Sequence, residues 1–94
     1  VEGNEYPYAY PVEGLAEEAG EVAGKFAKAL RDEHGIISNK RKTEIIKELG
    51  DVMWFVAELC TLLDADLEIV MQLNIAKLAD RAKRGVIGGS GDNR

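Results

Sequence analysis

The sequence predicts an all-α protein, an antiparallel bundle of three main helices that is completed by oligomerisation into packing of the four-helix-bundle type. Three observations indicate this fold. Apolar residues recur at helical spacing in three segments, short turns separate these segments, and the apolar residues exceed what three helices can bury. The 94 residues are expected to form a single domain, with residues 1–13 as an irregular arm and residues 85–94 as a glycine-rich tail.

The first two helices are expected at residues 14–34 and 40–63. Gly35 is suited to follow the end of the first helix, and Ser38 or Asn39 can cap the second. Each helix carries one long apolar stripe, which is expected to face the core. The stripes consist of Leu15, Ala19, Val22, Phe26 and Leu30 on the first helix, and Ile45, Leu49, Val52, Val56, Leu59 and Leu63 on the second.

The third helix is expected to begin at a cap, Asp64 or Asp66, and to end at about Arg84. It carries two apolar stripes rather than one, and Trp54 in the second helix lies roughly opposite the main stripe of that helix. A monomer of three helices cannot easily bury all of these surfaces. We therefore expect an obligate homodimer or homotetramer, with Trp54 at a subunit contact.

The composition excludes several classes of function. The net charge of −5 argues against binding of a nucleic-acid polymer, and no apolar run approaches the roughly 18–20 residues that span a membrane. The N-terminal stretch lacks the basic start and the apolar run of a secretory signal, and the single Cys60 cannot form an intramolecular disulfide. We therefore expect a cytoplasmic protein. Because the sequence begins with Val1 rather than Met, we expect it to be trimmed or part of a longer reading frame.

Two acidic motifs occur in the stretches "GLAEEAGEV" and "KELGDVMWF". Glu18 and Glu21 have the same spacing as Glu48 and Asp51, and each pair is offset by similar angles to the same side of its apolar stripe. Two antiparallel helices with these offsets can direct all four carboxylates into one groove, although both pairs could also point outward. Converging carboxylates raise one another's pKa values, and a divalent cation would relieve their repulsion.

Ligation by oxygen alone suits Mg²⁺, with Mn²⁺ as a possible substitute. A carboxylate di-iron centre is the competing interpretation, but it usually needs Glu-x-x-His pairs. The only histidine, His34, lies at a helix end far from the second acidic pair, and iron is therefore discounted. In the third helix one face carries a group that could bind phosphate oxygens: Asn74, Lys77, Arg81 and Arg84. The helix dipole alone could also explain Arg81 and Arg84.

These motifs together resemble the signature of MazG-like nucleotide pyrophosphohydrolases. The stretches "EEAGE" and "ELGD" are similar to the EExxE…ExxD pattern of that family, and "NIAKLADR" and "RGVIGGSGDNR" are similar to its third helix and its tail. The resemblance covers residues 14–94. It implies an all-α dimer or tetramer that hydrolyses a nucleoside triphosphate to the monophosphate and pyrophosphate with Mg²⁺, as enzymes that clean the nucleotide pool do.

The resemblance also implies roles for individual residues. The resemblance implies that four carboxylates are metal ligands: Glu18, Glu21, Glu48 and Asp51. Glu17 and Glu48 become the catalytic candidates, Glu17 as a further ligand or as the residue that orients the attacking water. The substrate-binding candidates are Asn74, Lys77 and Arg81 for the triphosphate, and Phe55, on the carboxylate flank of its helix, for the base. The arm before Gly14 lies outside the signature and is a place where base recognition could be decided.

Two alternatives stay open. The chain could be a non-catalytic module of the same fold, for helical oligomerisation or regulatory nucleotide binding. Alternatively it could share the substrates of relatives with similar bundles, which act on dUTP, dCTP or phosphoribosyl-ATP. No stretch of the sequence reads a particular base, so a permissive pocket is the expectation. The number of metal ions per site is also left open.

Overall fold

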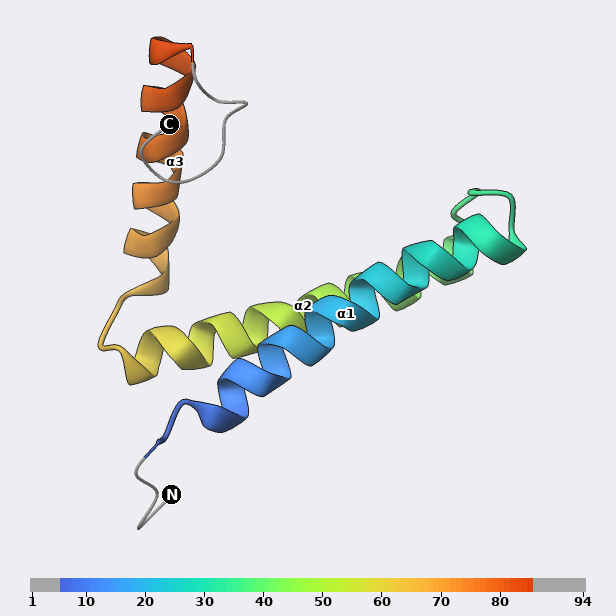
Figure 1. The fold of residues 1–94 in the computed structure, drawn as a ribbon, viewed down its shortest axis with the longest axis horizontal. Helices are drawn as coiled ribbons and strands as arrows, with labels where there is room; N and C mark the ends of the chain where they lie inside the picture. The colour runs from blue at the N-terminus through green and yellow to red at the C-terminus, as the bar shows by residue number, and fades with distance from the viewer. Residues whose placement is uncertain (1–5, 86–94) are drawn as a thin grey trace. The chain divides into compact units, whose positions relative to one another are not determined.

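The computed structural model describes residues 6–85, and every regular element in that range is an α-helix. The helices are α1 (Ala9–Asp32), α2 (Asn39–Leu62) and α3 (Leu67–Arg84), as Figure 1 shows. The predicted all-α class is therefore confirmed. The chain divides into two units, residues 1–63 with α1 and α2, and residues 64–94 with α3. The bundle of three helices and its oligomeric packing stay predictions, and the predicted tail beyond Gly85 lies outside the described residues.

α1 begins at Ala9, five residues before the predicted start at Gly14, so the predicted irregular arm is wrong for residues 9–13. Pro11 explains the difference. It is the third residue of α1, where a backbone N–H would have no partner within the helix, so the missing N–H of proline costs nothing there. Its ring is buried and contributes to packing. Residues 1–5 of the predicted arm lie outside the described residues.

The other helix ends agree with the predicted ends to within two residues. Ser38 caps α2, since its hydroxyl oxygen accepts a hydrogen bond from the backbone N–H of Arg41 at 3.1 Å. Asp66 caps α3 by accepting from two backbone N–H groups, at 2.8 and 3.4 Å. Gly35 follows α1 with a φ of 78°, a left-handed conformation that favours glycine. None of the described helices is long and apolar enough to cross a membrane.

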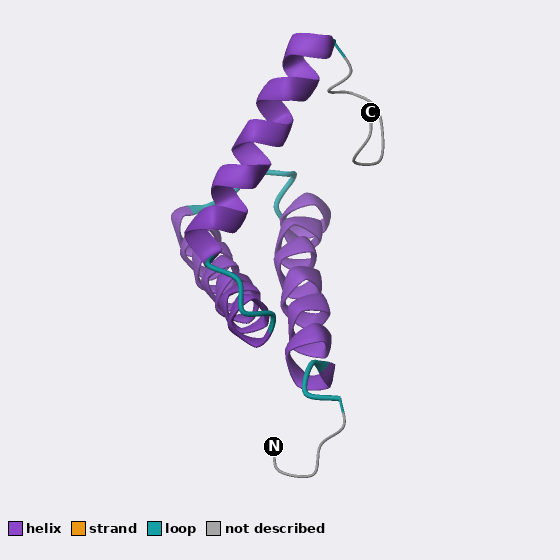
Figure 2. Ribbon diagram, turned by 90° about the vertical axis from the view of Figure 1, so that its left-hand side faces the viewer, coloured by secondary structure: helices purple, strands orange, loops and turns teal. Residues whose placement is uncertain are grey.

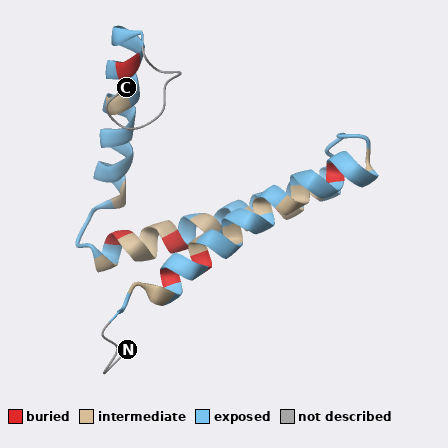
Figure 3. Cartoon of the chain, viewed as in Figure 1, coloured by how far each residue is buried: buried red, intermediate tan, exposed pale blue. Residues whose placement is uncertain are grey.

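α1 and α2 lie side by side and antiparallel, forming a helical hairpin whose turn comprises residues 33–38 (Figures 1 and 2). The buried residues of this hairpin lie near both ends of the line along which the helices meet, which we call the seam (Figure 3). They are Pro11, Gly14, Phe55 and Cys60 toward the open end, and Ala29 and Ile45 toward the turn. Between them the seam is half-buried and contains Glu18 and Glu48. The middle of the seam therefore places two carboxyl groups among half-buried apolar side chains, Leu15, Val22 and Val52.

The seam does not follow the apolar stripe predicted for α1. Phe26 is 49% exposed and Leu30 is 72% exposed. The residues that α1 buries are compact ones about 60–120° away from the centre of the stripe: Pro11, Gly14 and Ala29. Two stripe residues, Leu15 and Val22, are half-buried beside them, while Ala19, Phe26 and Leu30 are exposed. The prediction for α2 is better, because four of its six stripe residues are buried or half-buried, while Leu49 and Leu63 are exposed.

Five exposed apolar side chains of α1 and α2 lie on one side of the hairpin. In an antiparallel pair, residues that follow the seam positions by one lie on the same side of both helices. On α1 these include Phe26 and Leu30, and on α2 they include Ile46 and Met53, each 45% exposed or more. We call this surface the apolar face, and it consists of Phe26, Leu30, Ile46, Leu49 and Met53.

Gly14 lies against the ring of Phe55, and a Cβ at this position would overlap three ring carbons. Gly14→Ala is expected to lower the thermal midpoint, because displacing a packed ring costs about 1–3 kcal/mol. That cost exceeds the gain of up to about 1 kcal/mol that alanine normally brings to a helix. Gly20→Ala is the control, since its Cβ meets nothing within 4 Å, and it is expected to raise the midpoint. Melting curves by circular dichroism that rank the two variants in the opposite order would contradict this packing.

Candidate functional site

Three of the four predicted metal ligands meet at the middle of the seam. Glu18 of α1 and Glu48 and Asp51 of α2 each offer one carboxylate oxygen, and these oxygens lie within 4.8 Å of one another. Glu18 and Glu48 are half-buried and Asp51 is exposed. Glu18 lies one helical turn beyond Gly14, so the close packing of Gly14 on α2 also sets the position of Glu18. We call these three residues the carboxylate cluster.

The two other acidic residues of the α1 motif lie outside the carboxylate cluster. Glu21 is exposed, and it is near enough for its charge to raise the pKa of Glu18. Glu17 is also exposed. By helical geometry both lie on the side of the hairpin opposite the apolar face, so the side of α1 that carries the motif is open to solvent. Glu21 as a metal ligand stays a prediction. Glu17 as a residue near the attacking water also stays a prediction.

Glu18 has a pKa raised from 4.5 to about 7. The largest cause is a hydrogen bond with Glu48, which requires a proton between the two carboxyl groups. Loss of hydration at the seam raises the pKa further, as do the negative charges of Asp51, Glu48 and Glu21. A proton held here near neutral pH lowers the repulsion within the carboxylate cluster.

The donor set of the carboxylate cluster fits Mg²⁺. Carboxylate oxygens are the protein ligands that Mg²⁺ prefers, and at bond lengths of about 2.1 Å two such ligands lie at most about 4.2 Å apart. Side-chain rotations that move the oxygens by less than about 1 Å would bring the cluster within that limit. Among residues 6–85 the cluster consists of carboxylates alone, and the choice of Mg²⁺ over iron stays a prediction.

The raised pKa of Glu18 makes the stability of the metal-free protein depend on pH. A carboxyl group whose pKa rises on folding binds more protons in the folded chain, so its contribution to stability falls as the pH rises from 4.5 to about 7. Between pH 5 and pH 8 in EDTA, the thermal midpoint of the wild type is expected to fall relative to that of Glu18→Gln. Glu13→Gln, an exposed α1 variant, should follow the wild type. Parallel pH profiles for the wild type and Glu18→Gln would contradict the shared proton.

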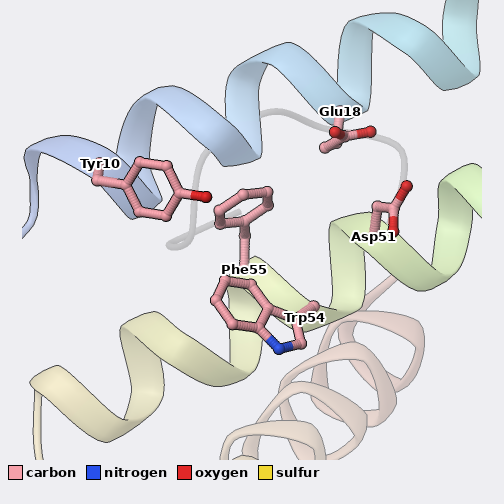
Figure 4. A pocket seen from close by; sticks show the side chains of 5 residues that line it. All are labelled: Tyr10, Glu18, Asp51, Trp54 and Phe55. Atoms are coloured by element: carbon pink, nitrogen blue, oxygen red, sulfur yellow. The ribbon is translucent and has the colours of Figure 1, made fainter.

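A pocket of about 410 Å³ adjoins the carboxylate cluster, and we call it the aromatic pocket. Figure 4 shows its three rings grouped on one side and its two carboxylates on the other. The Tyr10 and Phe55 ring centroids are 5.6 Å apart, and those of Trp54 and Phe55 are 5.1 Å apart. Both pairs meet edge to face, the arrangement that aromatic quadrupoles favour. The lining residues are Tyr10, Glu18, Asp51, Trp54 and Phe55.

The members of the aromatic pocket differ in burial. Phe55 is buried against Gly14 and forms the base of the pocket, whereas Tyr10 is 68% exposed and Trp54 is 55% exposed. Trp54, predicted at a subunit contact, lines the aromatic pocket together with Asp51, a place that its spacing in the sequence does not indicate. The place of Tyr10 was also missed, although the region before Gly14 was singled out for base recognition. Pro11 was the available signal for Tyr10, because proline is favoured in the first turn of a helix.

The residues predicted to bind the triphosphate lie on α3, in the second unit. Asn74 is exposed, Lys77 is half-buried and Arg81 is buried. Arg81 and Arg84 lie in the last turn of α3, where basic side chains interact favourably with the helix dipole. Their contact with a triphosphate therefore stays a prediction.

Comparisons with known proteins agree with this arrangement. Residues 10–86 match the family model of the MazG nucleotide pyrophosphohydrolase domain. The match begins at Tyr10, next to the start of α1. The Gene 37 protein of Mycobacterium phage L5 is 51% identical over 86 residues, which are 92% of this chain and 75% of that protein. No solved structure matches the chain. The extent of the family match and the identity to the phage protein show that this chain belongs to the MazG nucleotide pyrophosphohydrolase family.

Proposed function

We propose that this protein hydrolyses nucleoside triphosphates, ribose or deoxyribose, to the nucleoside monophosphate and pyrophosphate with Mg²⁺. The observation that carries the proposal is the carboxylate cluster directly beside the aromatic pocket, in a chain of this family. A nucleoside triphosphate has the same two parts, a planar base and a chain of phosphates that binds divalent cations. The aromatic pocket would contact the base, and the carboxylate cluster would hold the cation that binds the phosphates.

The carboxylates act by binding and by moving protons. When bound, Mg²⁺ would neutralise charge on the phosphates and lower the pKa of a water molecule that it holds. Glu18, Glu48 and Asp51 would hold the ion, with Glu21 as a further ligand, and the proton between Glu18 and Glu48 would leave on binding. Glu17 is exposed outside the cluster and is suited to orient the attacking water or to accept its proton. Positioning and charge stabilisation are then the protein's main contributions, as in other phosphoryl transfer.

The base would contact the aromatic pocket. Tyr10 and Trp54 are exposed enough to stack on a base, and Phe55 supports both rings from below. Stacking on aromatic rings tolerates every base, because each base has a π-face. Among the described residues the lining holds no amide side chain that could read a base edge. This composition favours a permissive enzyme, the property expected of one that clears unwanted nucleotides from the pool.

The apolar face supports a homodimer or homotetramer. Contiguous exposed apolar surface marks interaction sites, and two hairpins that meet through Phe26, Leu49 and their neighbours would give four-helix packing. By helical geometry Glu17, Glu21 and the aromatic pocket lie on the other side of the hairpin, so such an assembly would leave the entrance to the site open.

Product analysis tests the proposed function directly. The purified protein is incubated with each common NTP and dNTP, with and without Mg²⁺, and the products are separated by ion-exchange chromatography. We expect equal amounts of monophosphate and pyrophosphate, formed only with the metal. Release of a single phosphate would show that the wrong bond was assigned.

A non-catalytic nucleotide-binding module is the second candidate. It is favoured by one observation, that Glu17 and Glu21 lie outside the carboxylate cluster. Trp54 is the only tryptophan and lines the aromatic pocket, so its fluorescence reports nucleotide binding whether or not turnover occurs. Quenching accompanied by pyrophosphate release supports the enzyme. Quenching without any product, for the whole panel of nucleotides, supports the module.

A further inference from the structure

A second pocket of about 410 Å³ lies at the turn end of the hairpin, and the proposed hydrolysis does not use it. We call it the basic pocket, because α1 and α2 each bring two cations to it: Lys25, Lys28, Lys40 and Arg41. Its volume is within the range of about 300–1,000 Å³ that is usual for small-molecule sites. The pocket belongs wholly to the unit formed by α1 and α2.

Arg41 is the fixed part of this pocket. Its guanidinium pairs with Glu33 at 2.9 Å and with Glu44 at 3.1 Å, and its side chain is only 18% exposed. A second hydrogen bond, from Nε of Arg41 to Oε1 of Glu33 at 3.0 Å, holds the plane of the guanidinium. Both glutamates of the lining are thereby engaged, and Arg41 joins the end of α1 to the first turn of α2.

The three lysines of the basic pocket are differently placed. Lys25, Lys28 and Lys40 form no ion pair with another residue among those that the structure describes. Four basic and two acidic side chains leave the lining with a net charge of +2, in a chain whose net charge is −5. Such a local excess, against the sign of the whole molecule, attracts small anions.

The N-terminus of α2 adds to this attraction. Ser38 caps the helix and lines the pocket, so the first backbone N–H groups of α2 lie at its rim. The positive end of a helix dipole favours negative charge at this position. The hydroxyl of Ser38 already accepts a hydrogen bond from Arg41, which leaves its own O–H to donate outward.

The basic pocket is separate from the carboxylate cluster. Lys25 follows Glu18 by seven residues and Arg41 precedes Glu48 by seven, a distance of about 10 Å along either helix. The cluster repels anions unless a cation is bound, whereas the basic pocket attracts them without one. The two sites therefore differ in their requirement for a metal.

We propose that the basic pocket binds a small polyphosphate anion with the chemistry of pyrophosphate, and that it does so without a divalent cation. Three lysines that line one pocket from two helices suit an anion that carries several charged oxygens on adjacent phosphoryl groups. The inference goes beyond the proposed hydrolysis and does not depend on it. The same chemistry is offered by free pyrophosphate and by the phosphate chain of a nucleotide.

Isothermal titration with sodium pyrophosphate, in EDTA and about 150 mM salt, tests the proposal. The wild type is expected to bind one equivalent per chain, and Lys28→Gln/Lys40→Gln is expected to weaken binding by about tenfold or more. The matched control is Lys42→Gln/Lys47→Gln, which removes the same charge from exposed positions outside the pocket. Its affinity should stay within about twofold of the wild type. If both double variants bound pyrophosphate equally weakly, the loss of affinity would follow from the lower net charge alone, and the proposal would be overturned.

Glu48→Gln separates this site from the proposed active site. The variant is expected to lose hydrolysis and to keep metal-free binding of pyrophosphate, because the basic pocket is intact. Binding that requires Mg²⁺, or that disappears in Glu48→Gln, would assign the anion to the carboxylate cluster and overturn the proposal. A titration with ATP in EDTA identifies the source of the anion. Tighter binding of ATP that is lost in Lys28→Gln/Lys40→Gln supports a nucleotide phosphate chain, and equal or tighter binding of pyrophosphate supports the free anion.

Discussion

Glu48→Gln is expected to lower the rate of Mg²⁺-dependent pyrophosphate release by at least about 10²-fold, the loss typical when one charged group that stabilises a transition state is removed. Glu48 is the member of the carboxylate cluster that is both a predicted ligand and the hydrogen-bond partner of Glu18. Glutamine keeps the size of the side chain but has no charge with which to hold a cation. Chromatographic product analysis measures the loss.

The same substitution should have the opposite effect on the stability of the metal-free protein. Removing the charge of Glu48 relieves repulsion at a half-buried seam, so the thermal midpoint in EDTA is expected to rise. Mg²⁺ should raise the midpoint of the wild type, because it binds only the folded chain, and should have little effect on the variant. Glu58→Gln on the same helix is the control and should keep both the activity and the response to Mg²⁺. A variant that keeps its activity, or that melts lower in EDTA, would contradict the assigned role.

Phe26→Glu is expected to convert the assembled protein into monomers. Phe26 lies in the middle of the apolar face and is 49% exposed in the isolated chain. A carboxylate at this position would be buried without a partner in any assembly that covers the face. Removing a central aromatic contact commonly costs 2 kcal/mol or more, so association should weaken by at least about 30-fold.

Sedimentation velocity at micromolar concentration measures this change. Ile36→Glu is the matched control, because Ile36 is 68% exposed but lies in the turn rather than on the apolar face. It should leave the assembly unchanged. A wild type that sediments as a monomer would show that the apolar face is not covered by a second copy, and an oligomeric Phe26→Glu would locate the contact elsewhere.

The helix ends were predictable because local chemistry sets them. Ser38 and Asp66 accept hydrogen bonds from the first turns of their own helices. Gly35 adopts a positive φ, which glycine allows because it has no Cβ. The start of α1 was missed for a reason that is equally local. Proline interrupts a helix interior but is tolerated in the first turn, and the sequence does not state which of these positions Pro11 occupies.

The choice of seam could not be predicted from periodicity alone. A helical period identifies an apolar stripe, but it does not say whether that stripe meets the next helix or another surface. Here the compact residues Gly14 and Ala29 are buried at the seam on α1, while Phe26 and Leu30 of the predicted stripe are exposed. The matching angular offsets allowed carboxylates of both helices to share one groove, although both pairs could also have pointed outward. They did not predict that Glu18 itself would lie at the seam while Glu21 stays outside the cluster.

Both pockets depend on residues that only the folded hairpin brings together. Tyr10 reaches Phe55 across the seam, and Lys25 and Lys40 line one pocket only because the turn reverses the chain. Neither pair has a spacing in the sequence that marks it. The acidic motifs could therefore be recognised in the sequence, whereas the aromatic pocket and the basic pocket could be recognised only in the folded hairpin.

The short turn between α1 and α2 favours formation of the hairpin before any contact with a second copy. The carboxylate cluster and the aromatic pocket lie between Tyr10 and Phe55, on two helices joined by the six residues 33–38. Closing so small a loop costs little chain entropy, and helical contacts of this kind form within about microseconds to milliseconds. Meeting a second copy is a bimolecular step that slows with dilution. Each chain is therefore expected to bring its own carboxylates together before any contact with a second copy.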